Sequence, residues 1–290
     1  MRALPVAAAL RRILPGAGVA GPRRPLGAGS RLLSDGRGDR MIPGRSEHTW
    51  SLCGVELALE LWPDVFQPTS TSELLAEQLH IQPGEVVIDL GCGSGFFSIL
   101  AAKQGAAKVY AVDVMPQAVA LTRRNAERNG VGSRIEAFTG SLFEPLPDVH
   151  ANLIIDDVSG ITEAAARRTP WYPPSIPSGG PDGADSTVAM LHDAPQHLLP
   201  NGRLIFPVLS LANEQRILAE AQRAFADLRL RAQRLFPIPT MLQEALGRFK
   251  EHLQKGMLRL VQRGSRLCWQ LRIFEGRAAS RFTTGHSTPR

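Results

Sequence analysis

The sequence predicts an α/β fold in which a mostly parallel, doubly wound sheet is covered by helices on both faces. Three observations predict it. Short apolar runs alternate with segments of helical pattern, a glycine-rich turn follows the first run, and an acid ends each of the first two runs. Alternating strands and helices are typical of parallel sheets with crossover helices. Such sheets bind ligands at the carboxyl ends of their strands.

The elements of this sheet are predicted in order from residue 85. Short β-branched runs predict strands, and the longer amphipathic segments between them predict helices, with Gly130 ending one of them. The expected strands are Val86–Asp89, Lys108–Asp113, Arg134–Thr139, Ala151–Asp156 and Gly202–Val208. The expected helices are Gly95–Gln104, Pro116–Asn129, Asp185–Leu199 and a segment from about Ala212 to Leu228.

The C-terminal part departs from this alternation. The stretch LRLRAQRLFPIP predicts a strand, and residues from about 241 to 255 predict an inserted helix. Two further strands are expected around the turn Arg263-Gly264-Ser265. We place the end of the domain at residue 276 and expect a flexible tail over residues 277–290.

Two segments precede the predicted domain. Residues 41–84 are expected to form a helical extension, because VELALELW has apolar residues at helical spacing and PTSTSELLAEQL offers N-cap hydroxyls. Residues 1–40 hold eight arginines and two aspartates, which predicts a disordered leader or an organelle transit peptide. A general preference for arginine, with 29 arginines against four lysines in the chain, is an alternative origin of this composition.

Composition excludes several classes of protein. Hydrophobic residues make up 43% of the chain, enough for a sizeable core, but no apolar run reaches the roughly 18 residues of a membrane helix. The three cysteines lie far apart without metal-ligand spacing, so neither a metal site nor a disulfide framework is expected. We expect a cytoplasmic protein, or a mitochondrial matrix protein if the leader is a transit peptide. The sequence leaves the oligomeric state open.

Charge is distributed unevenly along the chain. Residues 41–202 carry 9 basic and 19 acidic side chains, and residues 203–290 carry 16 basic and 6 acidic ones. A basic C-terminal part can contact an anionic partner such as RNA. Alternatively, its arginines are solvated or pair with the acidic part of the same chain. The sequence leaves open whether these arginines bind an anionic partner or pair within the chain.

The glycine-rich turn lies in the stretch VVIDLGCGSG, residues 86–95. Its spacing, GxGxG, differs from the dinucleotide fingerprint GxGxxG, and no GKS or GKT is present to form a P-loop. The second strand ends at Asp113, where a carboxylate can accept hydrogen bonds from both hydroxyls of a ribose. The turn is therefore predicted to bind a ligand that contains a ribose, such as a nucleotide cofactor.

The stretch DLGCGSG, followed by AVDVMPQAV, resembles the class I methyltransferases that use S-adenosylmethionine. The resemblance implies a Rossmann-like sheet with an antiparallel last strand. It also implies that Asp89 faces the amino group of the cationic cofactor and that Ser141 bonds its adenine. Phe66 and Pro68–Thr71 resemble the region that covers the cofactor, and Phe143 either borders the adenine or belongs to the core. The expected cofactor residues are Asp89, Gly91, Cys92, Gly93, Gly95, Asp113, Val114, Met115, Ser141, Leu142 and Asp156.

The acceptor side resembles the release-factor glutamine methyltransferases less completely. Their NPPY motif would fall on Asp157-Val158-Ser159-Gly160, which keeps only the first polar position. A later GG-DG pattern, at Gly179-Gly180 and Asp182-Gly183, matches that group. We expect Asp157 to orient the acceptor as a hydrogen-bond acceptor. Trp171 and Tyr172 are expected to form a stacking wall for a flat substrate or, alternatively, to anchor their loop.

The predicted function is transfer of a methyl group from S-adenosylmethionine to a nitrogen of a protein or nucleic acid. The resemblance covers roughly residues 66–210. Two alternatives remain open at this point. One is a methyltransferase of small molecules, and the other is a non-catalytic module that binds the ribosome or RNA through the basic C-terminal part.

Overall fold

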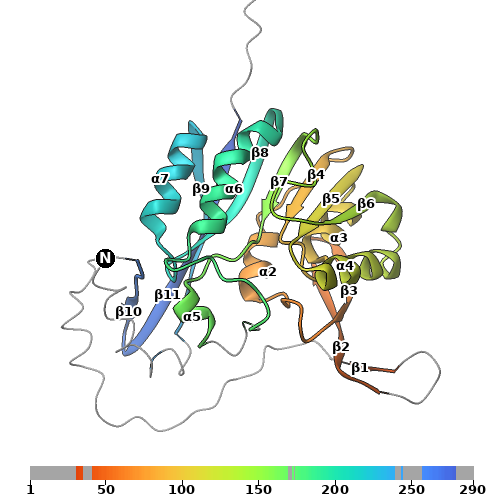
Figure 1. The fold of residues 1–290 in the computed structure, drawn as a ribbon, viewed down its shortest axis with the longest axis horizontal. Helices are drawn as coiled ribbons and strands as arrows, with labels where there is room; N and C mark the ends of the chain where they lie inside the picture. Colours follow the sequence, from red (N-terminus) through yellow and green to blue (C-terminus); the bar gives the residue numbers. More distant parts are fainter. Residues whose placement is uncertain are drawn as a thin grey trace, which may run out of the picture.

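A computed structural model of the chain describes residues 31–34, 41–168, 172, 174–238, 243 and 257–278. For residues 31–34 and 41–43 it describes the backbone alone. Figure 1 shows a central twisted sheet with helices packed against it, and a smaller sheet near residue 50 beneath one end.

The central sheet has the predicted α/β architecture. Its order is β10-β11-β8-β7-β4-β5-β6, and β9 pairs with β11. The pairs β4–β5, β5–β6, β4–β7 and β7–β8 are parallel, whereas β11 is antiparallel to β8, β9 and β10. This confirms a mostly parallel sheet with an antiparallel late strand. The strands are β4 Val86–Leu90, β5 Lys108–Asp113, β6 Ile135–Thr139, β7 Ala151–Asp156, β8 Leu198–Leu209, β9 Asp227–Pro237, β10 Val261–Arg263 and β11 Arg266–Arg277.

Helices cover both faces of this sheet because successive side chains of its buried strands point to opposite faces. In β4, Val87 belongs to one apolar core, shared with α3 and α4, and Ile88 belongs to the other, shared with α6 and α7. The helices are α2 Ser70–Ala76, α3 Phe96–Lys103, α4 Pro116–Arg128, α5 Glu163–Ala166, α6 Asp185–Asp193 and α7 Glu214–Ala224, with 3₁₀ turns η1 Gly132–Arg134 and η2 Ala194–His197.

The predicted helical extension over residues 41–84 is wrong for most of its length. Residues Met41–Leu52 (β2) and Val55–Leu61 (β3) form an antiparallel hairpin, and α2 follows it. In VELALELW the apolar residues satisfy a helical spacing, but Leu57, Leu59 and Leu61 also alternate with smaller or charged residues. This period of two prevails because all three leucines are buried against α3 and α4.

The ends of the chain hold further differences. Within the predicted leader, Arg31–Ser34 form strand β1, which pairs with β2, so this part of the leader is a strand. The predicted helix at about 241–255 and the tail from residue 279 lie outside the described residues, apart from residue 243. The predicted turn at Gly264 is confirmed, since β10 and β11 flank it.

In the part of the chain that the structure describes, none of the helices is both long and apolar enough to cross a membrane. Within the same residues, we find no cluster of three or more His, Cys, Asp or Glu side chains that could hold a metal ion.

Candidate functional site: a cavity at the carboxyl edge of the sheet

A cavity of about 760 Å³ lies at the carboxyl ends of β4, β5 and β7. Its walls are mostly apolar. Among the described residues that line it, four are charged, and all four are acids: Asp64, Asp113, Asp157 and Asp185. Lysine, arginine and histidine are absent from this described lining. The cavity is therefore suited to ligands that are cationic or rich in hydrogen-bond donors.

The glycine-rich loop forms one wall of the cavity. Gly91 and Cys92 donate backbone hydrogen bonds to the carbonyl of Val112, at 2.8 and 3.0 Å, which ties the loop to the end of β5. Gly91 has a φ of 77°, and a Cβ there would lie 2.9 Å from the carbonyl oxygen of Asp157. Glycine is needed at this position both for the left-handed backbone and for the close approach of β7.

Asp113 orients the same loop from the neighbouring strand. Its Oδ2 accepts a hydrogen bond from the Gly93 N–H at 3.0 Å, and its Oδ1 accepts one from the Met115 N–H at 2.9 Å. Burial raises the pKa of this carboxyl, and the two backbone N–H groups act in the opposite direction. Both oxygens retain further lone pairs, so Asp113 can still accept hydrogen bonds from a ligand in the cavity.

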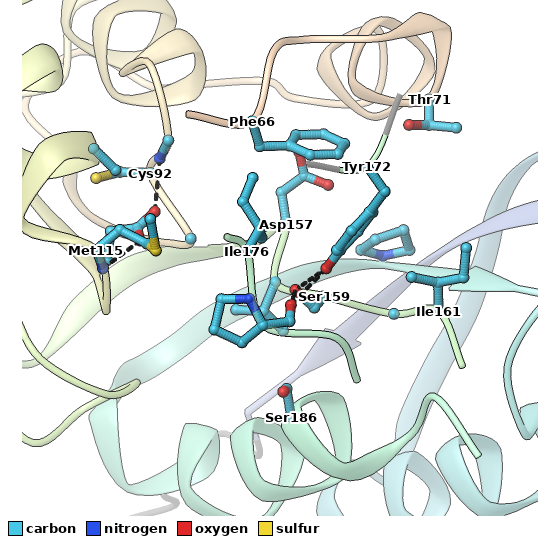
Figure 2. Close-up of a pocket in the computed structure, with 18 of the residues that line it drawn as sticks. Phe66, Thr71, Cys92, Met115, Asp157, Ser159, Ile161, Tyr172, Ile176 and Ser186 are labelled. Carbon is cyan, nitrogen blue, oxygen red and sulfur yellow. Dashed lines mark hydrogen bonds between the residues drawn. The ribbon is translucent and has the colours of Figure 1, made fainter. Parts of the chain in front are cut away.

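The structure brings most of the expected cofactor residues together. Those that line the cavity are Gly91, Cys92, Gly93, Asp113, Val114, Met115, Ser141 and Leu142. Val114 is 49% exposed, which is unusual for a large apolar side chain and leaves its surface available to a ligand. In Figure 2, Cys92 and Met115 lie at the end of the cavity opposite Tyr172.

Three of the expected cofactor residues, Asp89, Gly95 and Asp156, lie behind the cavity surface. Asp89 is fully buried, accepts a hydrogen bond from Ser98 Oγ of α3, and keeps its Oδ1 without a partner among the described residues. Burial raises its pKa to about 7. Asp156 is also fully buried, and burial raises its pKa well above the usual range of a carboxyl. Gly95, with a φ of 84°, begins α3.

The loop after β6 contains Ser141 and Leu142, which were predicted to contact the cofactor, and Phe143, which was predicted either to border the adenine or to belong to the core. Ser141 and Leu142 line the cavity, and Leu142 has a φ of 50°, which is rare for a leucine. Phe143, in contrast, stacks on His197 with ring centroids 4.2 Å apart and belongs to the apolar core. The alternative that placed Phe143 in the core is the one that the structure has.

Asp157 follows β7 and lies beside the glycine loop, where its N–H donates to the Leu90 carbonyl at 3.0 Å. Its Oδ2 accepts a hydrogen bond from Ser72 Oγ of α2 at 3.3 Å, and Thr69 caps that helix. Burial raises the pKa of Asp157 to about 7. At neutral pH this carboxyl is therefore divided between its charged and neutral forms and can exchange a proton with a neighbouring group.

Tyr172 covers the acceptor side of the cavity. Its hydroxyl bonds with Ser159 Oγ and with the carbonyl of Pro177, and its ring lies edge-on to Phe66 with centroids 5.8 Å apart. Figure 2 shows the two rings next to each other, above the chain from Asp157 to Ser159. Tyr172 therefore lines the cavity beside Phe66 and also anchors its loop through its hydroxyl, as the alternative expected, while Trp171 lies outside the described residues.

Sequence reasoning missed the wall formed by the C-terminal strands. Phe236 of β9 and Trp269 of β11 are paired in register, stack with centroids 4.8 Å apart, and both line the cavity. Aromatic residues in the late strands were a signal of such a wall. Their position depended on β11 entering the sheet between β8 and β9, which no local pattern indicated.

The GG-DG pattern has a structural role. A Cβ on Gly179 would lie 2.5 Å from the Gly183 carbonyl oxygen, and a Cβ on Gly183 would lie 2.6 Å from the Thr162 nitrogen. Asp182 accepts hydrogen bonds from Asn213 and Arg216 of the segment that begins α7. The pattern therefore fixes the loop after the acceptor strand against the body of the domain.

Ion pairs within the chain involve much of the basic C-terminal part. Its arginines contact acids of the same part, such as Glu214 and Glu275, as well as acids of the preceding part, such as Glu77 and Glu85. This supports internal pairing for those residues. The described arginines of this part that lie within 4.0 Å of an acid are Arg203, Arg216, Arg223, Arg229, Arg231, Arg234, Arg259, Arg272 and Arg277.

Known proteins resemble this chain in sequence. The family described as ribosomal protein L11 methyltransferase matches residues 67–177. A release factor glutamine methyltransferase of Geobacter sulfurreducens is 36% identical over 165 residues, covering 54% of this chain and 57% of the relative. A putative protein N5-glutamine methyltransferase of Methanocaldococcus jannaschii is 31% identical over 170 residues, covering 55% of this chain and 79% of the relative. The match spans little more than half the length of the first of these relatives.

A solved structure shares the fold. The T. thermophilus 16S rRNA N2 G1207 methyltransferase, in complex with AdoMet and guanosine, superposes with a TM-score of 0.52 at 14% identity, covering 83% of this chain and 52% of that one. At this identity the likeness concerns the fold alone. The methyltransferase relatives indicate S-adenosylmethionine as the cofactor. The chain belongs to the protein N5-glutamine methyltransferase group of the class I S-adenosylmethionine-dependent methyltransferases.

Proposed function

We propose that the protein transfers a methyl group from S-adenosylmethionine to a nitrogen atom of a protein. The observation that carries this proposal is the cavity itself. The glycine loop, Asp113, Asp157 and Tyr172 all line it, and its described lining has acidic side chains but no lysine, arginine or histidine.

The donor side fits the cofactor by its chemistry. When bound, S-adenosylmethionine supplies an electrophilic methyl group on a positively charged sulfur. Asp113 would accept hydrogen bonds from ribose hydroxyls, and the glycine loop, which Gly91 allows to pack against the Asp157 backbone, would border the cofactor. An acidic lining favours a cation, whereas it would repel the pyrophosphate of a dinucleotide. Val114, Met115, Ser141 and Leu142 would border the adenine.

Asp157 would act on the acceptor. Its carboxylate can accept a hydrogen bond from an acceptor N–H, hold the nitrogen lone pair toward the donor side, and take up the released proton. Ser72 Oγ donates to Oδ2 of this carboxyl, which fixes its orientation. The apolar wall of Tyr172, Phe236 and Trp269 would exclude water from the acceptor.

Two observations favour a protein acceptor over a nucleic acid. Nucleic-acid sites use lysine and arginine to hold phosphates, and the described cavity lining contains neither. Many arginines of the C-terminal part are also engaged in ion pairs with the protein's own acids. The relatives named for protein glutamine and ribosomal protein methylation agree with this choice. We further propose a reducing compartment, the cytoplasm or the mitochondrial matrix, in which the three free cysteines would stay reduced.

The test uses the full chain and a methyl-labelled donor. The protein is incubated with labelled S-adenosylmethionine and with protein, RNA or small-molecule fractions of a cell extract. We expect label in the protein fraction with the wild-type protein, and much less with Asp157→Asn. Label confined to RNA or to small molecules would overturn the protein assignment. Absence of label from every fraction, with cofactor bound, would favour a non-catalytic module.

A further inference from the structure

The N-terminal hairpin and the cofactor loop are joined through a single helix. Strand β3 pairs with β2 on one edge, and its other edge faces α4, as Figure 1 shows. A free strand edge exposes N–H and C=O groups that need partners. In this protein, two asparagines supply those partners: Asn125 of α4 and Asn129, the C-cap residue of that helix.

Asn129 and Asn125 bind β3 in the same manner. Asn129 accepts a hydrogen bond from the Ala58 N–H at 3.1 Å and donates to the Ala58 carbonyl at 2.8 Å. Asn125 accepts from the Glu60 N–H at 2.8 Å and donates to the Glu60 carbonyl at 2.9 Å. The spacing permits this match, because four residues of a helix rise about 6 Å and two residues of a strand rise about 6.8 Å.

The two asparagines differ in their second donor bond. Asn129 Nδ2 also donates to the carbonyl of Asn125, within its own helix, at 2.8 Å. Asn125 Nδ2 also donates to the carbonyl of Ser94, in the glycine-rich loop, at 2.9 Å. Asn125 is fully buried and Ser94 lines the cavity. Of this matched pair, Asn125 is therefore the one that reaches the cofactor site.

A neighbouring side chain supports the same arrangement. Thr122, one turn before Asn125, donates to the carbonyl of Gly93 at 3.1 Å. Two successive carbonyls of the loop thus face α4, and because the peptide is planar and trans, the Ser94 N–H points away from α4. The orientation of these peptides depends on α4.

Charged groups hold the hairpin in place on this helix. Glu60 is 1% exposed, and its carboxylate accepts hydrogen bonds from Trp62 Nε1 at 2.8 Å and from Arg124 of α4, with Arg45 at 3.6 Å. Burial by itself would raise the pKa of Glu60, but the hydrogen bonds from Trp62 and Arg124 outweigh it and hold the pKa below its usual value. These contacts therefore hold β3 within hydrogen-bond distance of Asn125.

We propose that Asn125 is a positioning residue for the cofactor, which transmits the placement of the N-terminal hairpin to the peptides of the glycine-rich loop. The inference rests on the cofactor site described above and does not depend on the identity of the methyl acceptor. Asn125 touches neither the cavity nor the reacting atoms. Its removal should weaken cofactor binding and leave the chemical step at saturating cofactor unchanged.

The test compares Asn125→Ala with Asn129→Ala in the full chain. Both variants lose the bonds to β3, so both should lower the melting temperature. We expect the dissociation constant for S-adenosylmethionine, measured by calorimetry below both melting temperatures, to rise about ten-fold in Asn125→Ala and less than about two-fold in Asn129→Ala. KM for the cofactor should rise in parallel, with kcat retained.

A second variant covers the case in which Asn125→Ala does not fold. Asn125→Asp keeps the acceptor for the Glu60 N–H but replaces the amide donor to Ser94, and it should show the same loss of affinity. Equal dissociation constants in the wild-type and the Asn125 variants would overturn the inference, as would an equal loss in Asn129→Ala. A wild-type protein that binds no S-adenosylmethionine would instead overturn the cofactor assignment, and this inference with it.

Discussion

The donor half and the acceptor half of the cavity differ in how the chain builds them. The donor half comes from consecutive elements, β4, the glycine loop, α3 and β5. It is held by backbone N–H groups that donate to the Val112 carbonyl and to the Asp113 carboxylate. The acceptor half combines Ser72, Asp157, Tyr172 and the late strands, which are far apart in sequence. A local motif can specify the first half, whereas the second half exists only once the whole sheet has formed.

This difference has a functional consequence. A cofactor that is the same for every member of a family can be bound by one compact site built from a local motif. An acceptor varies between enzymes, and a site built from several separate loops can change one wall without disturbing the others. Val158-Ser159-Gly160 stand where the resemblance would place the two prolines and the tyrosine of the NPPY motif, and Tyr172 of another loop bonds Ser159 there. The first prediction below concerns a substitution in the donor half, and the later predictions concern substitutions that test the acceptor half.

The largest expected effect comes from Gly91→Ala. The new Cβ would lie 2.9 Å from the Asp157 carbonyl oxygen, and the residue would keep a φ of 77°. Left-handed strain of about 1–2 kcal/mol adds to an overpacking cost of about 1–3 kcal/mol. We expect the affinity for S-adenosylmethionine to fall roughly a hundred-fold, measured by calorimetry.

Gly130→Ala is the matched control for this variant. Gly130 has a similar φ of 69°, but nothing lies within 4 Å of its would-be Cβ. It should lower the melting temperature through backbone strain and leave cofactor affinity within about two-fold. A Gly91→Ala variant that binds as tightly as Gly130→Ala would contradict the close-approach argument.

The second prediction separates transfer from binding. Asp157→Asn removes a proton acceptor and keeps the side-chain shape, so we expect kcat to fall roughly a hundred-fold or more, with cofactor affinity nearly unchanged. Because the pKa of Asp157 is about 7 and its charged form is the base, the wild-type rate should rise with pH through about 7. This limb of the pH–rate profile should be missing in the variant. An identical profile in both proteins would remove Asp157 from the chemistry.

Stability gives an independent check on the same residue. The folded-state pKa of Asp157 lies above its unfolded value, so the wild-type protein binds more protons when folded and loses stability as pH rises from about 4 to about 7. Asp157→Asn does not titrate. Its melting temperature relative to the wild type should therefore increase over this pH range, as differential scanning fluorimetry would measure. A difference in melting temperature that stays constant from pH 4 to 8 would argue against the raised pKa.

The outcome at particular residues shows what the sequence could predict. The strand ends at Asp113 and Asp156, and the glycine loop between β4 and α3, follow from local periodicity and from glycine chemistry, and the structure has them. The hairpin strand β3 was missed because its leucines fit two periodicities and because Glu60 is buried, where Trp62, Arg124 and Arg45 stabilise its carboxylate. The wall of Phe236 and Trp269 was missed because it depends on strand register across β9 and β11.

A smaller effect is expected for Tyr172→Phe. The change removes a hydroxyl that bonds Ser159 and Pro177 and keeps the ring that meets Phe66. The net loss of about 0.5–1.5 kcal/mol should raise KM for the acceptor by roughly three- to ten-fold without changing cofactor affinity. Tyr110→Phe is the matched control, because Tyr110 stacks on Phe138 of β6 away from the cavity. Equal kinetics in the two variants would show that the hydroxyl of Tyr172 does not shape the acceptor half.

The smallest effect is expected at the exposed turn between β10 and β11. Arg263 and Arg266 flank Gly264 there, and both are exposed. If the acceptor is a protein recognised in the acidic cavity, the double variant Arg263→Ala, Arg266→Ala should change kcat/KM by less than about two-fold, with a similar dependence on salt in both proteins. A nucleic-acid acceptor held at this turn would behave differently, because each lost phosphate contact lowers the slope of log affinity against log salt by about 0.7 to 0.9. Kinetics at several salt concentrations would detect that change. Such a change would show that the substrate is recognised by the basic C-terminal strands and not by the acceptor half of the cavity.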